Sequence, residues 1–343
     1  MVHSGFAKLK CKIMENLFCG IDISKDYLDI ALCLGSEKEI VFDSKVANSE
    51  KGINKLIKEL DVQAKGKKLW VCFEHTGNYG LLLAYLLHKA KVTFSIVSSL
   101  EIMRSSGLIR GKSDPVDAKR IALYAATFSH KLKPYQLPDK ALLKLKSLLT
   151  IREQYVRIRT QFKNAIKSLK ISAECIDLKQ EIQTFQKEIK RYNKLVEAVE
   201  LKMETIIEQE EQLNQNYKKS IQIIGVGPIT ATAILVYTNN FTSFDNPRKF
   251  NCYCGLAPFE YSSGQSIKRQ TKTSRYRNKD MKKLLFNAAN TAIIYDQQIR
   301  TYFKRKTADG KHKMSVINAI ACKIVLRVFA VVKRDEPFVR FSV

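Results

Sequence analysis

Short runs of apolar residues separated by polar turns predict a mixed α/β domain in the first part of the chain. The expected strands are Phe18–Ile23, Tyr27–Leu34, Glu39–Val46, Lys68–Phe73 and Val92–Val97. The expected helices, where apolar residues recur every three or four positions, are Asn48–Leu60, Tyr79–Ala90 and Asp117–Phe128. Three strands in a row followed by alternating helices and strands are typical of an RNase H-like fold, opening with an antiparallel meander.

The middle of the chain has helical spacing throughout. Apolar residues recur every three or four positions from Leu145 to Leu169 and again from Ile182 to Tyr217, with one polar intrusion at Glu210. This heptad-like pattern predicts a long helical hairpin or coiled coil and favours self-association. A helix packed on its own domain is the alternative.

The last third predicts a mainly α-helical domain that opens with a glycine-containing turn. Gly225 and Gly227 precede an apolar helix, Ile229–Tyr237, in a pattern that resembles a helix-hairpin-helix element. Such glycines let the backbone approach a phosphate, and the helix N-terminus supplies free N–H groups. A plain tight turn explains the pattern equally well. The expected organisation is an unstructured extension, an RNase H-like domain, a coiled coil and a C-terminal domain, at residues 1–14, 15–130, 131–217 and 218–343.

The strong positive charge of the chain indicates a polyanionic partner. The chain carries 59 Lys and Arg against 33 Asp and Glu, a formal net charge of +26. Over half of this excess lies from Lys218 to Val343. Nucleic acid is the expected partner, because each neutralised phosphate releases a counterion. A membrane is not expected, because no apolar run approaches the roughly 18 residues of a span, and Arg327 interrupts the apolar stretch Val325–Val332.

The eight cysteines do not suggest a metal site. None of them forms a CxxC pair, so structural zinc is not expected. Scattered free cysteines fit a reducing cytoplasm, and no signal peptide is visible at the N-terminus.

Four carboxylates stand out by their placement on the predicted elements. Asp22 lies within the first predicted strand, Glu74 directly follows the strand Lys68–Phe73, and Asp114 and Asp117 begin a predicted helix. Taken singly, each has an ordinary structural explanation: a hydrogen-bonded strand residue, a helix cap or a dipole partner. Taken together in a basic chain they favour catalysis. Oxygen ligands without a His or Cys cluster suit Mg²⁺, and two such ions can clamp a phosphodiester.

The motifs resemble the DEDD transposases of insertion sequences, the IS110 family, which are guided by a bridge RNA. GIDISKDYLDIAL carries Asp22, FEHTGNYG carries Glu74, and KSDPVDAKRIA carries Asp114 and Asp117. IIGVGPITATAIL, FTSFDNPRKFNCYCGLAP and the SSG at 262–264 follow the family's second domain in order. The resemblance covers nearly the whole chain from Met14. It implies a RuvC-like nuclease domain, a coiled coil and a transposase domain with a nucleophilic serine.

That resemblance assigns the nucleophile to Ser263, with Ser262 as an adjacent competitor. By itself the segment would be an ordinary Ser-Gly turn. Basic residues that could stabilise the phosphoryl charge or bind nucleic acid follow it: Lys268, Arg269, Lys272, Arg275 and Arg277. The sequence departs from the family at one point, because Arg277 stands where a glycine is expected.

The resemblance therefore implies a transposase that cuts and rejoins donor and target DNA with Mg²⁺ and a serine. A structured guide RNA and a homo-oligomer, a dimer or tetramer, are the further partners implied. Three alternatives stay open at this stage: a site-specific DNA invertase of the same superfamily, a metal-only junction nuclease in which Ser263 is idle, and a non-catalytic nucleic-acid-binding scaffold.

Overall fold

The structure, a computed structural model, describes residues 16–105, 114–263, 267–273 and 276–334. The predicted extension, residues 1–14, lies outside the described residues. The chain divides into two compact units, residues 1–137 and 138–343.

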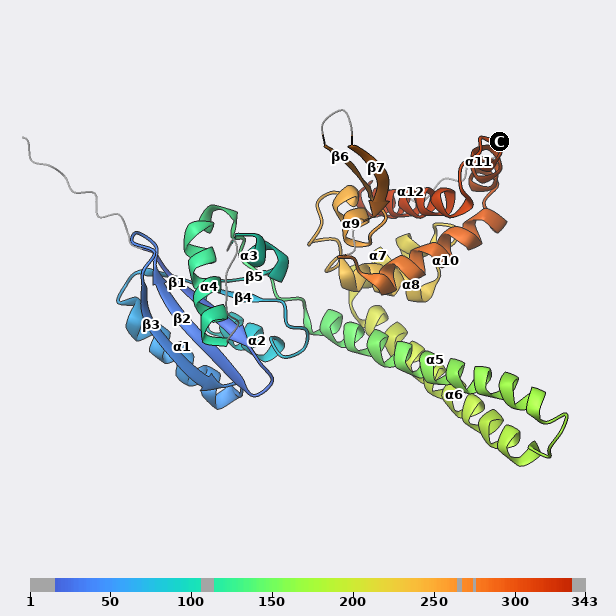
Figure 1. Ribbon diagram of the computed structural model, residues 1–343, viewed down its shortest axis with the longest axis horizontal. Coiled ribbons are helices and arrows are strands. Elements are labelled where there is room, and N and C mark those ends of the chain that lie inside the picture. The colour runs from blue at the N-terminus through green and yellow to red at the C-terminus, as the bar shows by residue number, and fades with distance from the viewer. Residues whose placement is uncertain (1–15, 106–113, 264–266, 274–275, 335–343) are drawn as a thin grey trace, which may run out of the picture. The chain divides into compact units, whose positions relative to one another are not determined.

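The first unit is built on a five-stranded mixed sheet (Figure 1). Its strands are β1 (Asn16–Ile23), β2 (Tyr27–Leu34), β3 (Ile40–Ala47), β4 (Lys68–Glu74) and β5 (Phe94–Val97). The order is β3-β2-β1-β4-β5, in which β1, β2 and β3 form an antiparallel meander and β4 and β5 run parallel to β1. The predicted RNase H-like arrangement of three strands and then two is therefore confirmed, with strand ends within two residues of those expected.

Two separate hydrophobic cores cover the two faces of the sheet. The helices of this unit are α1 (Glu50–Ala64), α2 (Leu81–Lys89), α3 (Ser99–Ser105), α4 (Asp114–Thr127) and a short 3-10 turn, η1 (Ser129–Lys131). Ile21 and Phe73 share one core with residues of α1 and α2. Ala31 and Cys72 share the other core with residues of α3 and α4. Because strand residues alternate between faces, even-numbered residues of β1 and β4 lie on the α4 face.

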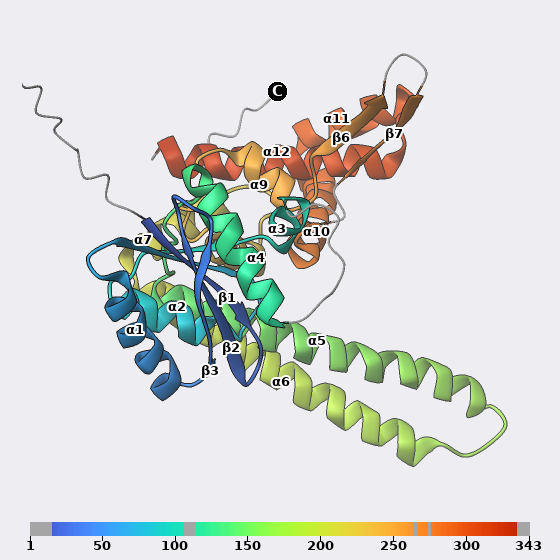
Figure 2. The ribbon, with the colours of Figure 1, turned by 60° about the vertical axis from the view of Figure 1, so that its left-hand side comes forward.

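Gly20 brings α4 into direct contact with β1, and Figure 2 shows the helix lying against the sheet. A methyl group at Gly20 would lie 2.2 Å from the backbone nitrogen of Ala122 and 2.4 Å from the carbonyl oxygen of Ala118. Both are backbone atoms, so no side-chain adjustment makes room. Asp117 directly precedes Ala118, and Asp22 follows Gly20 by two residues on the same face of the sheet.

The second unit begins with an antiparallel pair of long helices, α5 (Lys140–Ser172) and α6 (Lys179–Gln209). Arg152 pairs with Glu200 at 2.6 Å near its base, and the rings of Phe162 and Phe185 lie 5.3 Å apart further out. The long helical hairpin is therefore present. The prediction of one continuous helix through Glu210 was wrong. Helix α6 ends at Gln209, Glu210 is extended, and a separate helix, α7 (Glu211–Ile221), follows.

The remaining core of the second unit is helical. It is formed mainly by residues of α8 (Pro228–Tyr237), α9 (Pro247–Tyr253), α10 (Lys279–Tyr295), α11 (Gln297–Ala308) and α12 (Lys313–Arg334). One addition was not predicted. The strands β6 (Pro258–Ser263) and β7 (Ile267–Thr273) form an antiparallel hairpin, which pairs with none of the other described strands.

Helix α12 corrects the expectation about apolar runs. By length and composition alone it could cross a membrane, and it is the one helix in the described part of the chain of which this is true. Half of its apolar window is buried in the protein, however, as in the core helix of a folded domain. Arg327, which interrupts the apolar run, donates to Asp296 Oδ2 at 2.6 Å. The helix is therefore accounted for by packing within the second unit.

Candidate functional site

Asp22 and Glu74 lie at the ends of adjacent parallel strands. The register of β1 and β4 pairs Ile21 with Phe73, so the two carboxylate residues follow side by side on the α4 face. Both are half-buried. One oxygen of Asp22 accepts a hydrogen bond from the backbone N–H of Ile23 at 3.1 Å. Glu74 Oε2 accepts one from the hydroxyl of Ser99, at the start of α3, at 2.6 Å.

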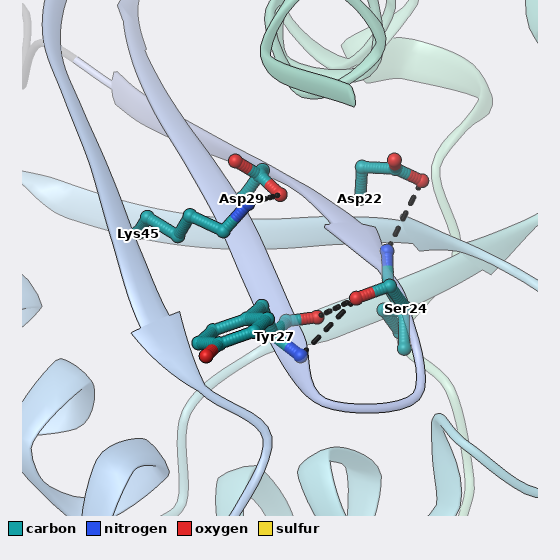
Figure 3. Close-up of polar contacts among 6 residues, drawn as sticks. Asp22, Ser24, Tyr27, Asp29 and Lys45 are labelled. Carbon is teal, nitrogen blue, oxygen red and sulfur yellow. Dashed lines mark hydrogen bonds and ion pairs between the residues drawn. The ribbon is translucent and has the colours of Figure 1, made fainter. Parts of the chain in front are cut away.

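A third acidic residue continues this row across the sheet. Asp29 on β2 is directly opposite Asp22 in the antiparallel register, and Lys45 on β3 is opposite Asp29. Asp29 is only 4% exposed, and its Oδ2 lies 3.4 Å from Lys45 Nζ (Figure 3). The row Glu74–Asp22–Asp29–Lys45 thus crosses four strands on one face. Sequence reasoning missed Asp29, although an acidic residue inside the apolar run YLDIALCL was a visible signal.

Helix α4 carries the other two predicted carboxylates. It begins at Asp114, whose side chain lies outside the described part of the structure. Asp117 is half-buried in the first turn and accepts a hydrogen bond from Arg120 at 2.6 Å. Lys119, on the same helix, pairs with Asp43 of β3 at 2.7 Å. The first two turns of α4 therefore carry both acids and bases on the side of the sheet that bears Asp22.

The donor set fits a hard divalent cation only in part. Asp22 and Glu74 supply oxygen ligands on neighbouring strands, which suits Mg²⁺. Among the side chains that the structure describes, no three His, Cys, Asp or Glu groups are close enough to hold an ion. Burial, together with the negative charge of Glu74, raises the pKa of the Cys72 thiol on the same face to about 12. Cys72 therefore stays protonated near neutral pH and does not offer a thiolate as a metal ligand on this face.

The predicted nucleophile lies at the far end of the β6–β7 hairpin. Ser263 pairs with Ile267, and Ser262 with Lys268, in the antiparallel register. Lys268, Arg269 and Lys272 lie on β7, so the basic residues run along the strand that faces the two serines. The side chains of these residues lie outside the described part, as do Gly264 and Arg275 entirely.

Polar contacts hold the base of this hairpin. Asn278 caps α10 through the N–H of Met281 and donates to the Tyr253 hydroxyl at 2.9 Å. Lys282 Nζ donates to the carbonyl of Gly255 at 2.8 Å and reaches Thr273 Oγ1 at 3.4 Å. Burial lowers the pKa of Lys282, and the nearby Arg277 lowers it further. These contacts join β7 to the helical core.

Arg277, which stands where the family pattern has glycine, packs over Gly255. Gly255 has φ +67°, and a methyl group there would lie 2.4 Å from Arg277 Cδ. The long stem of Arg277 occupies the space over a glycine that already has a left-handed conformation. The departure from the pattern is thus accommodated locally.

The two glycines of the turn before α8 have different surroundings. Gly225 has φ +96°, and a methyl group there would lie 2.2 Å from the carbonyl oxygen of Ala288 on α10. Gly227, which precedes Pro228 at the start of α8, has nothing within 4 Å of such a group. Close packing explains Gly225, whereas the N-terminus of α8 beside Gly227 has room for a ligand.

Two protein-family models match the chain. One, described as "Transposase", matches residues 19–169. The other, described as "Transposase IS116/IS110/IS902 family", matches residues 220–304. Together they cover well over half of the chain. The first spans the motifs that carry the four carboxylates, and the second spans the motifs around Ser263.

Full-length relatives are also similar to the chain. The "Pilin gene-inverting protein" of Moraxella bovis is 27% identical over 337 residues, which cover 95% of this chain and 98% of the relative. The protein of the same name from Moraxella lacunata gives the same values. The "Insertion element IS110 uncharacterized 43.6 kDa protein" of Streptomyces coelicolor is 34% identical over 114 residues, 33% of this chain and 28% of that protein.

One solved structure is similar over the first part of the chain. It is "T. thermophilus RuvC in complex with Holliday junction substrate", with 14% identity and a TM-score of 0.28, covering 35% of this chain and 99% of that one.

Proposed function

This chain belongs to the IS110 family of transposases, and on that premise we propose that it cuts and rejoins DNA with a carboxylate site in its first unit and a serine nucleophile in its second. As a family member it is a DNA transposase or recombinase and acts on DNA. The observation that supports the detailed proposal is the adjacency of Asp22 and Glu74 at the ends of β1 and β4, on the face covered by α4.

The proposed ligands are Asp22, Glu74, Asp114 and Asp117. When bound there, Mg²⁺ neutralises and orients a DNA phosphate. The carboxylates hold their positions because Ile23, Ser99 and Arg120 donate hydrogen bonds to Asp22, Glu74 and Asp117 respectively. For Asp117 to serve as a ligand, its contact with Arg120 must be shared or exchanged.

Ser263 supplies the covalent chemistry in this proposal. Its hydroxyl oxygen bonds to phosphorus and gives up its proton, while the bond from phosphorus to one DNA oxygen breaks and that oxygen takes up a proton. In the rejoining step a DNA hydroxyl attacks the phosphoserine, and Ser263 leaves with its proton restored. One phosphodiester is exchanged for another, so no nucleotide cofactor is consumed.

The two active parts lie in different compact units, which bears on assembly. One DNA phosphate must meet both the carboxylates and Ser263. We therefore propose a homo-oligomer, a dimer or tetramer, in which the parts meet within or between copies. The α5–α6 hairpin is proposed as a coiled-coil contact between copies.

Nucleic acid is proposed to bind at the basic strand and at the turn before α8. Lys268, Arg269 and Lys272 on β7, with Arg275 and Arg277 after it, supply positive charge. The open space at Gly227 beside the N-terminus of α8 supports a phosphate contact of the helix-hairpin-helix kind. A structured guide RNA is proposed from the family resemblance, and base pairing by that RNA would supply sequence specificity. The protein is proposed to act in the cytoplasm, where it meets the DNA of the nucleoid.

A DNA invertase is the second candidate function. The Moraxella relatives, whose printed name is pilin gene-inverting protein, align with 95% of this chain. Inversion and transposition share the cutting and rejoining steps proposed above. Sequencing recombined DNA distinguishes them, because inversion reverses a fixed segment, whereas transposition joins element ends to new sites.

Trapping a covalent adduct tests the serine. The full chain with its copurifying RNA and labelled element-end DNA should yield a protein–DNA adduct that survives denaturation. Ser263→Ala should abolish the adduct, and the neighbouring Ser262→Ala should retain it. Cutting by Ser263→Ala at the rate of the unaltered protein would contradict the proposal and support a metal-only nuclease. If the unaltered protein binds the DNA but neither cuts it nor forms an adduct, and Asp22→Ala and Ser263→Ala leave binding unchanged, the chain acts as a scaffold.

A further inference from the structure

Among the residues that the structure describes, the edge strand β3 and the start of β2 present an exposed surface, here called the ledge, beside the proposed carboxylate site. On β3, Asp43, Lys45 and Ala47 are exposed on the α4 face, whereas Phe42 and Val46 belong to the core beneath the opposite face. Helix α4 covers the sheet near Gly20 and reaches β3 through its Lys119–Asp43 pair. Tyr27 and Lys45 lie beyond that pair toward the Asp22 end of the sheet, and both are about half exposed, 51% for Tyr27 and 53% for the Lys45 side chain.

The Lys45 ammonium is held in place on this ledge. It lies 3.4 Å from Oδ2 of the buried Asp29 and 5.1 Å from the centre of the Tyr27 ring (Figure 3). A buried carboxylate requires a charge partner or hydrogen bonds, which explains why a lysine is anchored here. An ammonium has three donors, and its exposed side remains open to solvent. Lys45 can therefore neutralise Asp29 and still meet a phosphate.

The Tyr27 ring is presented by a rigid turn. The Ser24 hydroxyl donates to the Tyr27 carbonyl at 2.8 Å and accepts from the Tyr27 N–H at 3.1 Å. The Ser24 N–H donates to the same carbonyl at 3.0 Å. The side chain of Asn48 ties this turn to the loop after β4 by donating to the carbonyls of Ser24 and Tyr79. An exposed ring on a fixed turn is a stacking surface for an unpaired base.

Spacing relates the ledge to the site of cutting. Lys45 is two strands away from Asp22 in the cross-strand row, about 10 Å at the usual strand separation. A strand whose phosphate is held at Asp22 would therefore pass Lys45 and Tyr27 within a few nucleotides.

We propose that Tyr27 and Lys45 bind the DNA strand that is cut, with Tyr27 stacking on an unpaired base next to the scissile phosphate and Lys45 contacting a neighbouring phosphate. Asp29 acts as a positioning residue that holds Lys45. This inference rests on the proposed function, because it takes Asp22 as the place where the phosphate is held.

Photocrosslinking provides a local test. The full chain is mixed with a random-sequence single-stranded oligodeoxynucleotide containing 5-iodouracil and irradiated, and the crosslinked peptides are identified by mass spectrometry. The peptide containing Tyr27 should be crosslinked. Tyr27→Ala should weaken binding of the oligonucleotide at this ledge about 10-fold, and Tyr27→Phe should keep it, because the ring does the stacking.

Charge variants separate binding from support of the fold. Lys45→Met should lower the Tyr27 crosslink yield several-fold, and Lys45→Arg should restore it. The matched control is Lys55→Met, a lysine on α1 that also pairs with an acid, Glu59, at 3.6 Å. Because Lys45→Met leaves the buried Asp29 without this partner, the double variant Asp29→Asn with Lys45→Met removes both charges, and its folding is checked by circular dichroism. The double variant should remain defective. Recovery of the crosslink in it would reduce Lys45 to a structural partner and overturn the proposal.

Further outcomes separate this inference from the proposed function. Absence of a crosslink at Tyr27, with cutting still lost in Asp22→Ala, overturns the strand-binding inference alone. A crosslink at Tyr27 with cutting unaffected by Asp22→Ala overturns the proposed function and leaves the ledge as a DNA-binding surface. An oligoribonucleotide that crosslinks at Tyr27 when the DNA does not would assign the ledge to RNA and overturn the proposal.

Discussion

The carboxylates and the serine are carried on different kinds of scaffold. Asp22 ends the central strand of a five-stranded sheet, and Glu74 ends a strand flanked on both sides, with helices covering both faces. Ser263 ends a strand of a two-stranded hairpin that pairs with no further strand in the described residues. A two-stranded hairpin is marginally stable by itself, so this one depends on contacts at its base.

This difference teaches how the two chemical roles can be divided. A metal site needs several ligands in a fixed geometry, which a sheet packed on both faces provides. A nucleophile needs only to reach one phosphorus atom and later to leave it. A hairpin anchored at Thr273 and Gly255 by Lys282 can present such a group without disturbing the core.

The largest effect is expected for Asp22→Ala. Loss of this ligand should slow DNA cutting by roughly three orders of magnitude, because a metal clamp contributes several kcal/mol and each 1.4 kcal/mol is a factor of ten. Thermal stability should change little, and Asp61→Ala, an exposed acid on α1, should cut normally. Gel assays of strand cleavage measure the rate. A fully active Asp22→Ala protein would remove the distinction between the two scaffolds.

The next largest effect is expected for Asp296→Ala, which should lower the free energy of unfolding of the second unit. Asp296 is 6% exposed, caps α11 through the N–H of Ile299 at 3.0 Å, and accepts from Arg327 at 2.6 Å. Loss of a cap and of a largely buried ion pair should cost about 3 kcal/mol. Urea unfolding followed by circular dichroism measures it. Asp309→Ala, which breaks an exposed pair with Lys306, should leave the urea midpoint nearly unchanged, because solvent screens an exposed ion pair. Equal losses would show that burial is not the cause.

Glycine substitutions compare the packing of the first unit, at Gly20, with that of the second unit, at Gly225. Gly20→Ala and Gly225→Ala should each destabilise the protein by about 2 kcal/mol, because both added methyl groups would meet backbone atoms at 2.2 Å. The matched control is Gly227→Ala, which meets nothing within 4 Å and should keep the melting temperature. If phosphate approaches there, Gly227→Ala should still weaken DNA binding. A destabilised Gly227→Ala protein would count against that interpretation.

The smallest effect is expected at alkaline pH and involves one tyrosine from each unit. Burial raises the pKa of Tyr124 to about 12, with a further contribution from Glu101, and burial likewise raises that of Tyr253 to about 12. The folded protein therefore keeps protons that unfolded tyrosines release near pH 10, so stability should fall between about pH 10 and 12. Tyr124→Phe and Tyr253→Phe should each flatten this fall. Urea midpoints at about pH 9 and pH 11.5 test it, and parallel pH curves for all three proteins would refute the assignment.

Much of the first unit could be predicted because its apolar runs are short and end at polar turns. The strands carrying Asp22 and Glu74 were expected within two residues of their observed bounds. Asp29 was missed because its role depends on the pairing of β2 with β1 and β3, and cross-strand register is not visible in one strand's pattern.

The second unit was less predictable for two physical reasons. The segment of β6 and β7 is rich in Ser, Lys, Arg and Thr, so its polar side chains hide the strand signal. Apolar spacing continued across Glu210 even though the chain leaves the helical conformation there, because residues on both sides of the break enter one core. Core packing can preserve a helical spacing through an interruption of the helix itself.

In the first unit, one strand register determines both which side chains of β1 are buried and which face of the sheet carries Asp22. Moving β1 by one residue along its neighbours would turn Asp22 toward Ile30 and Phe73 and bring Ile21 out beneath α4. A chain paired that way would bury a charged carboxylate and misplace apolar side chains. Such a misfolded chain would be degraded by cellular proteases. Quality control of the fold thereby also selects the strand register that aims the carboxylate.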